Sequence, residues 1–165
     1  MKVLNYQGKM IDPLNLKKED LSNLGMQCAV TLARLQRFWG QCRESYTVAQ
    51  HCLSMVEMFE DIELQKWALG HEIYEGLTSM DIPSPIKHSE AYSPYKKAEE
   101  KTLILFADEY GLQSPMPTEI KLADKQLLVM EAEALMPFNA ECDWREIQVP
   151  KGTMLYFNNN LLINL

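Results

Sequence analysis

Two of the chain's three histidines stand in apolar helical patterns, each close to groups that can bind a metal ion. His51 lies in the string TVAQHC, and His71 lies in ALGHEIYEG, where Glu72 follows it directly. A further carboxylate, Asp124, interrupts the apolar side of a distant helical pattern in KLADKQLL. Imidazole and carboxylate groups together are what a hard or borderline divalent cation requires. Burying these carboxylates without a partner would be costly, so we expect pairing or one shared metal site.

Each of these residues also has an ordinary structural interpretation. A buried histidine is commonly a hydrogen-bonded core residue, and the spacing alone cannot show that the three helical patterns converge. Glu75 lies one helical turn beyond His71 on the same side. It is either a solvated helix carboxylate or a general acid–base group beside an activated water.

Helical periodicity predicts the elements that must position these residues. Apolar residues at spacings of three and four predict five helices, at residues 20–36, 47–59, 62–75, 95–110 and 118–135. Thr47 is a candidate cap of the second helix, and Gly111 a candidate stop of the fourth. The string DIPSP at 81–85 is predicted to be non-helical, because each proline pushes the preceding residue to extended geometry. We expect an all-α fold, a single bundle of about five or more helices at 1–137. A short irregular or hairpin-like C-terminal appendix at 138–165 is expected to pack on the same domain.

Length, charge and cysteine usage narrow the class of protein. The chain has 165 residues, enough for one domain, and a formal net charge of −7, which argues against a nucleic-acid polymer as partner. A small phosphate substrate stays open, because a bound metal supplies local positive charge. No apolar run approaches the ~20 residues of a membrane helix, and no secretory leader is recognised, so we expect no membrane association and a cytoplasmic location. The cysteines are expected to be free thiols, and they are Cys28, Cys42, Cys52 and Cys142.

The strings YTVAQH, ALGHEIYEG, DIPSPIK and KLADKQLL, in this order and separation, resemble the HD-domain phosphohydrolase superfamily. Within it the chain is most similar to bacterial and phage 5′-deoxynucleotidases, over about three-quarters of its length, from GKMIDPLNLKKEDL at Gly8 through RFWG to about Met136. The resemblance implies an HD-type helical bundle and a location in a bacterial or virus-infected host cell. It also implies removal of phosphate from deoxyribonucleoside 5′-monophosphates by a water activated at the metal.

The resemblance also assigns roles to residues. It implies a divalent metal (Mn, Co, Mg, Zn or Fe) held by His51, His71, Glu72 and Asp124. Glu75 corresponds to the family's catalytic glutamate. The implied substrate-binding residues are Arg37 for the phosphate, Asp81 near the sugar, and Lys87 after the proline-rich turn. Arg37 is expected to take part in catalysis as well.

The residues alone leave alternatives for these substrate-binding positions. Arg37 is either a surface residue that ends a helix or a planar partner for phosphate. Trp39 either fills the core or stacks on a nucleobase. Asp81 either caps the DIPSP turn or accepts a hydrogen bond from a deoxyribose hydroxyl. His88 is expected to be exposed.

Two departures from the family pattern bear on function. The doublet reads His-Glu rather than His-Asp, so Glu72 must reach the metal with one more methylene group, and the stretch from Glu75 to Asp81 is one residue longer than usual. Two alternatives stand beside the monophosphatase. One is a deoxynucleoside triphosphate phosphohydrolase, with or without a preference for dATP. In that enzyme Lys87 and Arg43 would bind the longer phosphate chain. The other is a catalytically weakened protein that binds a nucleotide or a partner. Relatives commonly form homo-oligomers, and the apolar tail Leu161–Leu165 would cover either a neighbouring subunit or its own core.

Overall fold

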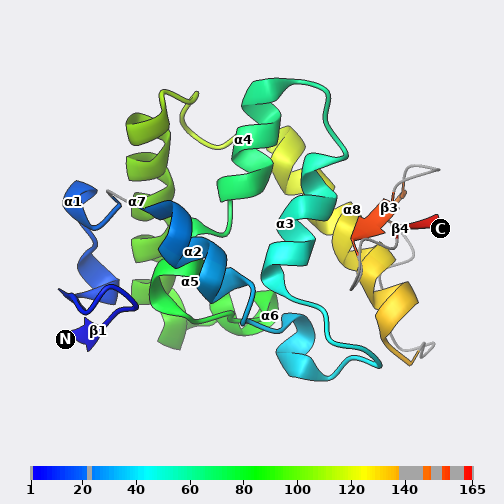
Figure 1. Cartoon of the computed structure of the whole chain (residues 1–165), viewed down its shortest axis with the longest axis horizontal. Helices are drawn as coiled ribbons and strands as arrows, with labels where there is room; N and C mark the ends of the chain where they lie inside the picture. The colour runs from blue at the N-terminus through cyan, green and yellow to red at the C-terminus, as the bar shows by residue number, and fades with distance from the viewer. Residues whose placement is uncertain (1, 22–23, 138–146, 150–153, 157–161, 165) are drawn as a thin grey trace.

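The computed structural model describes residues 2–21, 24–137, 147–149, 154–156 and 162–164. The elements, in chain order, are β1 (Val3–Leu4), β2 (Met10–Ile11), η1 (Pro13–Asn15), α1 (Lys18–Leu21), α2 (Leu24–Leu32), η2 (Arg37–Gly40), α3 (Val48–Val56), α4 (Ile62–Gly70), α5 (Ile73–Thr78), α6 (Ser84–Lys87), η3 (Glu90–Tyr92), α7 (Ser93–Tyr110), α8 (Thr118–Leu135), β3 (Met154–Tyr156) and β4 (Leu162–Asn164). Helices dominate these residues, as Figure 1 shows, so the prediction of an all-α fold is confirmed.

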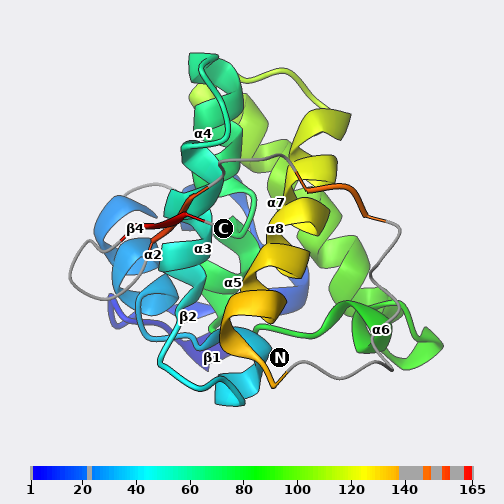
Figure 2. The ribbon, with the colours of Figure 1, turned by 90° about the vertical axis from the view of Figure 1, so that its right-hand side faces the viewer.

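Helix α3 lies at the centre of the bundle, in contact with α2, α4, α8 and β3 (Figure 2). It begins at a capping box, in which the Thr47 hydroxyl accepts from the backbone of Gln50 and the Gln50 side chain accepts from the backbone of Thr47. The Thr47 cap is thus confirmed, and so is the stop at Gly111, which ends α7 in the left-handed conformation. The long helices α7 and α8 enclose the core from two sides, and its largest fully buried side chains include Trp67, Tyr46 and Tyr74.

Two of the five predicted helices differ markedly from the structure. The helix predicted at 20–36 stops at Leu32, the end of α2, because residues 35–37 pair instead with the chain before α3. Two backbone bonds make this pairing, from Arg37 N–H to the Tyr46 carbonyl and from Val48 N–H to the Leu35 carbonyl. The helix predicted at 62–75 is two helices, α4 and α5, separated at His71 and Glu72.

The prediction that all of 81–85 is non-helical is wrong at its end. Ser84 and Pro85 open the short helix α6, since a proline in the first turn lacks only an N–H that would have no helical partner. The N-terminal β1–β2 hairpin was also not predicted. It pairs Val3 with Ile11 and Leu4 with Met10, and these pairs are too short to show a period of two in the sequence.

In the C-terminal part, β3 pairs antiparallel with β4, and Leu155 is fully buried in the core against α3. The remainder of the predicted appendix, including Cys142 and both ends of the tail Leu161–Leu165, lies outside the described residues. Cys28, Cys42 and Cys52 are free cysteines. Within the described part of the chain, no helix combines the length and the apolar character needed to cross a membrane.

Candidate metal centre

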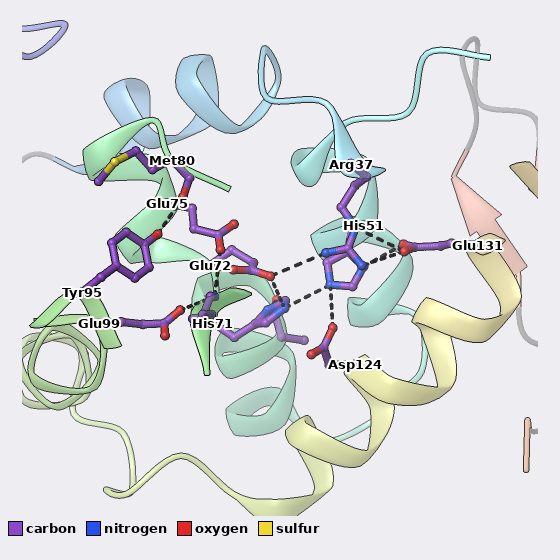
Figure 3. A network of polar contacts seen from close by, with 12 residues as sticks. Arg37, His51, His71, Glu72, Glu75, Met80, Tyr95, Glu99, Asp124 and Glu131 are labelled. Carbon is purple, nitrogen blue, oxygen red and sulfur yellow. Dashed lines mark hydrogen bonds and ion pairs between the residues drawn. The ribbon is translucent and has the colours of Figure 1, made fainter. Parts of the chain in front are cut away.

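Helix α3 places His51 at the middle of the bundle, where its side chain is fully buried. Its two ring nitrogens face different partners. Nδ1 lies 2.7 Å from Oε1 of Glu131, and Nε2 lies 3.3 Å from Oδ1 of Asp124 and 3.1 Å from Nε2 of His71 (Figure 3). Both carboxylates come from α8 and are seven residues apart, so they lie on the same face of this helix, two turns from each other. Each of them contacts one nitrogen of the His51 ring.

The interruption between α4 and α5 brings two consecutive side chains into this cluster. His71 ends α4, and Glu72 leaves helical geometry with φ −98° and ψ 20°. Neighbouring residues of one continuous helix point about 100° apart. Here Nε2 of His71 and Oε1 of Glu72 lie 3.5 Å apart, and the imidazole is fixed from behind by the Ala68 carbonyl, 2.7 Å from Nδ1.

Four donor atoms therefore converge, one each from His51, His71, Glu72 and Asp124, and all lie within 4.8 Å of one another. The structure thus brings together the four residues that the sequence singled out. His51, His71 and Glu72 are largely buried, whereas the Asp124 side chain is 43% exposed and forms the open side of the cluster.

The chemistry of these donors fits a divalent cation. Glu131 and the Ala68 carbonyl accept at the two Nδ1 positions, which leaves the Nε2 lone pairs of His51 and His71 facing each other at 3.1 Å. Two lone pairs at that distance repel unless a positive charge lies between them. Two imidazoles and two carboxylates around one point are a donor set for a borderline or hard metal ion.

Without a metal ion, a proton takes the place of that charge. Burial and the nearby Arg37 charge lower the pKa of His51, but Glu131 and Asp124 outweigh them and raise it to about 9. Burial lowers the pKa of His71. One proton on His51 Nε2 can therefore be shared with the unprotonated His71 and with Asp124.

Arg37 is buried next to the cluster, so the interpretation of it as a surface residue is wrong. Its Nε and NH2 atoms donate to Oε2 of Glu131 at 3.2 and 2.8 Å, and its NH1 lies 3.8 Å from Oε1 of Glu72. Burial raises the pKa of Glu131, but the Arg37 and His51 charges outweigh it and hold that pKa below its usual value. Glu131 is consequently an ionised, acceptor-only group.

Arg37 opens a tight turn, η2, whose backbone is unusual. Phe38, Trp39 and Gly40 have φ of 52°, 55° and 71°, all in the left-handed region. This turn directs Arg37 inward and leaves Trp39 59% exposed, so the interpretation of Trp39 as a core residue is wrong. The indole Nε1 of Trp39 donates to the Asp81 carbonyl at 3.3 Å. The residue predicted to stack on the base is therefore in direct contact with the residue predicted to bind the sugar. Burial raises the pKa of Asp81 above its usual value, although the Arg37 charge opposes this shift. The N-cap position of α6 is Pro83, which makes no side-chain cap bond.

Glu75 on α5 is buried, with 1% of its surface exposed, so it is not a solvated helix carboxylate. Lys87 lies between Glu75 and Glu99, with Nζ 3.2 Å from Oε1 of Glu75 and 2.7 Å from Oε1 of Glu99. Within the described residues Oε2 of Glu75 is buried without a hydrogen-bond partner. Burial and the Glu72 charge raise the pKa of Glu75 well above its usual value, despite Lys87.

The sequence interpretation missed Glu131 and Glu99. Glu131 had a signal, since it interrupts the apolar string LLVMEAEAL two turns after Asp124 on the same helix face. Glu99 had none, because it stands among charged residues in KKAEEK. His88, the third histidine, is exposed as expected.

Comparison with known proteins finds a relative that matches most of the chain. No protein-family model matches the chain. The uncharacterized protein YfdR of Escherichia coli (strain K12) is 31% identical over 133 residues, which cover 81% of this chain and 71% of YfdR. The name of that relative states no activity.

Proposed function

This chain belongs to the same family as YfdR, and we propose that it is a metal-dependent phosphohydrolase of the HD-domain type. The proposed reaction removes phosphate from deoxyribonucleoside 5′-monophosphates. The observation that carries the proposal is the convergence of four metal donors beside a buried arginine and a buried glutamate. The order of these donors along the chain, His51, then His71 and Glu72, then Asp124, supports the HD-domain assignment.

A bound divalent cation would lower the pKa of a water molecule and polarise a phosphoryl oxygen. The chain's contribution is to hold the four donors and to exclude bulk water from three of them. The carboxylates of Glu72 and Asp124 bring two negative charges to this point, which balance the charge of one divalent ion.

In the proposed reaction Arg37 binds the phosphate. Two of its donor atoms are engaged by Glu131, and NH1 extends toward Glu72 at the edge of the donor cluster. A guanidinium suits phosphate because its planar donors make directed, charge-assisted bonds. Its ion pair with Glu131 also fixes the side chain before the substrate arrives, which limits the entropy lost on binding.

In the proposed reaction Glu75 is the general acid–base group that transfers the proton. In the proposed hydrolysis the oxygen of water forms a bond to phosphorus, the bond from phosphorus to the 5′ oxygen breaks, and that oxygen takes up one proton. The raised pKa of Glu75 favours its protonated form, which can donate to that oxygen, and Oε2 has no hydrogen-bond partner among the described residues. The products are a deoxynucleoside and inorganic phosphate.

The test is a substrate panel with purified protein and added Mn²⁺, Co²⁺ or Mg²⁺. We expect release of inorganic phosphate from deoxynucleoside monophosphates, loss of that release in His71→Ala, and no change in His88→Ala, whose histidine is exposed. No phosphate release with any of these ions would contradict the proposal. Release of triphosphate from dATP in preference to phosphate from dAMP would replace it with a triphosphate phosphohydrolase. Binding of dAMP without turnover or bound metal would replace it with a nucleotide-binding protein.

A further inference from the structure

Glu131 is a fully buried carboxylate whose two oxygens serve two different side chains (Figure 3). Oε1 lies 2.7 Å from Nδ1 of His51, and Oε2 accepts from Nε and NH2 of Arg37 at 3.2 and 2.8 Å. The first partner is a donor in the metal cluster, and the second is the candidate phosphate ligand. The carboxylate itself stands outside the cluster of four metal donors.

The contact with Oε1 determines which nitrogen of His51 is available to a metal ion. A carboxylate paired with a guanidinium can only accept, so the hydrogen of this bond lies on Nδ1 of His51. Nε2, directed toward His71 and Asp124, is then the ring nitrogen that a metal ion can take in place of a proton. A hydrogen bond of this kind also fixes the plane of a metal-binding imidazole.

The contacts with Oε2 determine which face of Arg37 is available to an anion. They engage the Nε and NH2 edge of the guanidinium and leave NH1 directed toward Glu72, 3.8 Å away. Arg37 and Glu131 are both buried, so each would be left as a buried charge without the other.

We propose that Glu131 is a positioning residue that prepares the metal site and the anion site together, through His51 and Arg37. The inference rests on the proposed function only in that Arg37 faces a phosphate. A single carboxylate is needed because both partners are donors. A glutamine has one acceptor oxygen and one NH2 group, so in either orientation its NH2 group faces N–H donors of Arg37 or Nδ1 of His51. If His51 changed tautomer to accept from that amide, the hydrogen would move to Nε2 and block the metal site.

The variant Glu131→Gln tests this requirement, with Glu133→Gln as its matched control. Glu133 lies two residues further on α8 and is exposed. The probes are Zn²⁺, measured by competition with a chelating dye, and inorganic phosphate, measured by calorimetry on the Zn²⁺-loaded protein. We expect Glu131→Gln to weaken Zn²⁺ or phosphate binding by about 10- to 100-fold, the range for residues that support metal ligands, and Glu133→Gln to weaken neither. A folded Glu131→Gln protein that binds both probes like the unchanged chain would overturn the inference.

A second measurement keeps the test decisive if Glu131→Gln does not fold. Nitrogen-15 NMR of histidine-labelled, Zn²⁺-loaded protein reports the tautomer of His51 directly. We expect a hydrogen on Nδ1 and metal coordination through Nε2; coordination through Nδ1 would overturn the inference. A chain that binds Zn²⁺ with this tautomer but hydrolyses no deoxynucleotide would contradict the proposed function alone. Unchanged binding in Glu131→Gln, with hydrolysis intact, would contradict the inference alone.

Discussion

The Nε2 atoms of His51 and His71 lie 3.1 Å apart, while the Nδ1 atom of each ring is engaged by an acceptor outside the metal cluster. The two rings are tilted by 52°, so they meet at their edges rather than stack. This relationship places two ring lone pairs at one point and makes a positive charge there necessary for a stable core.

Metal removal is expected to lower the thermal stability of the protein. An ion that binds only the folded state stabilises it by about 2.7 kcal/mol at a free concentration 100 times its dissociation constant. Differential scanning fluorimetry should therefore show a lower melting temperature after dialysis against EDTA and recovery on addition of Mn²⁺ or Zn²⁺. The His71→Ala variant serves as control and should not respond to either ion. An equal response of both proteins would show that the ion binds elsewhere.

Metal binding is expected to release a proton. The pKa of His51 is raised to about 9 in the metal-free protein, so the ring keeps its proton below that pH, and the ion must displace it. The apparent affinity should rise about tenfold per pH unit as the pH increases toward 9, and then level off. Calorimetry at pH 7.5 in buffers of different ionisation enthalpy measures the released proton. Zero proton release would contradict this protonation of the metal-free site.

Shortening Glu72 to aspartate is expected to weaken metal binding, even though aspartate is typical at this position in the HD-domain family that the chain resembles. The carboxylate of Glu72 already reaches the donor cluster, and removal of one methylene would withdraw it by roughly 1.5 Å, one carbon–carbon bond. We expect about tenfold weaker Mn²⁺ binding in Glu72→Asp and a greater loss in Glu72→Ala. Tighter binding and faster turnover in Glu72→Asp would instead indicate that this chain is a weakened enzyme.

Gly70 is expected to tolerate no side chain. A Cβ atom at this position would lie 2.0 Å from Cζ of Phe106, whose ring packs edge-on against Trp67 in the core. Gly70→Ala should lower the free energy of unfolding by about 1–3 kcal/mol or more. Because Gly70 precedes His71, metal affinity should fall as well. Gly111→Ala is the control, because a Cβ atom at Gly111 would meet open space while the backbone φ is +63°. It should lower the free energy of unfolding by only about 1 kcal/mol and leave metal affinity unchanged. Urea unfolding and metal titration measure both effects.

Trp39 is expected to affect substrate binding without affecting stability. Its ring is 59% exposed, so Trp39→Ala should change the free energy of unfolding by less than about 0.5 kcal/mol. If the ring stacks on a base, the loss of about 1–3 kcal/mol of binding free energy raises KM about 5- to 150-fold. Tyr6→Ala is the matched control, because Tyr6 is as exposed as Trp39 and lies in the N-terminal segment, distant from Trp39 in the sequence. A KM that is unchanged in Trp39→Ala would exclude base stacking.

The sequence was sufficient for the long helices α7 and α8 and for the residues of the cluster, but not for the local geometry that joins them. Periodicity located α7 and α8 well, because their apolar residues keep one phase over 18 residues. It could not show the break at His71 and Glu72, since Leu64, Trp67 and His71 continue the helical spacing across it. The left-handed turn at Phe38 was equally hidden, because only Gly40 there is a residue type that favours such a conformation. Both features depend on contacts between distant segments, which a single sequence does not encode locally.

The turn from Arg37 to Gly40 connects the interior of the bundle to its surface within four residues. Left-handed backbone costs about 1–2 kcal/mol for each residue other than glycine, so the packing of Phe38 against the core must hold this turn in place. In the proposed enzyme, the grip on the charged end of a nucleotide and the choice of its base would then depend on one rigid backbone segment. A relative that altered only this segment could change its preferred substrate while keeping the same metal donors.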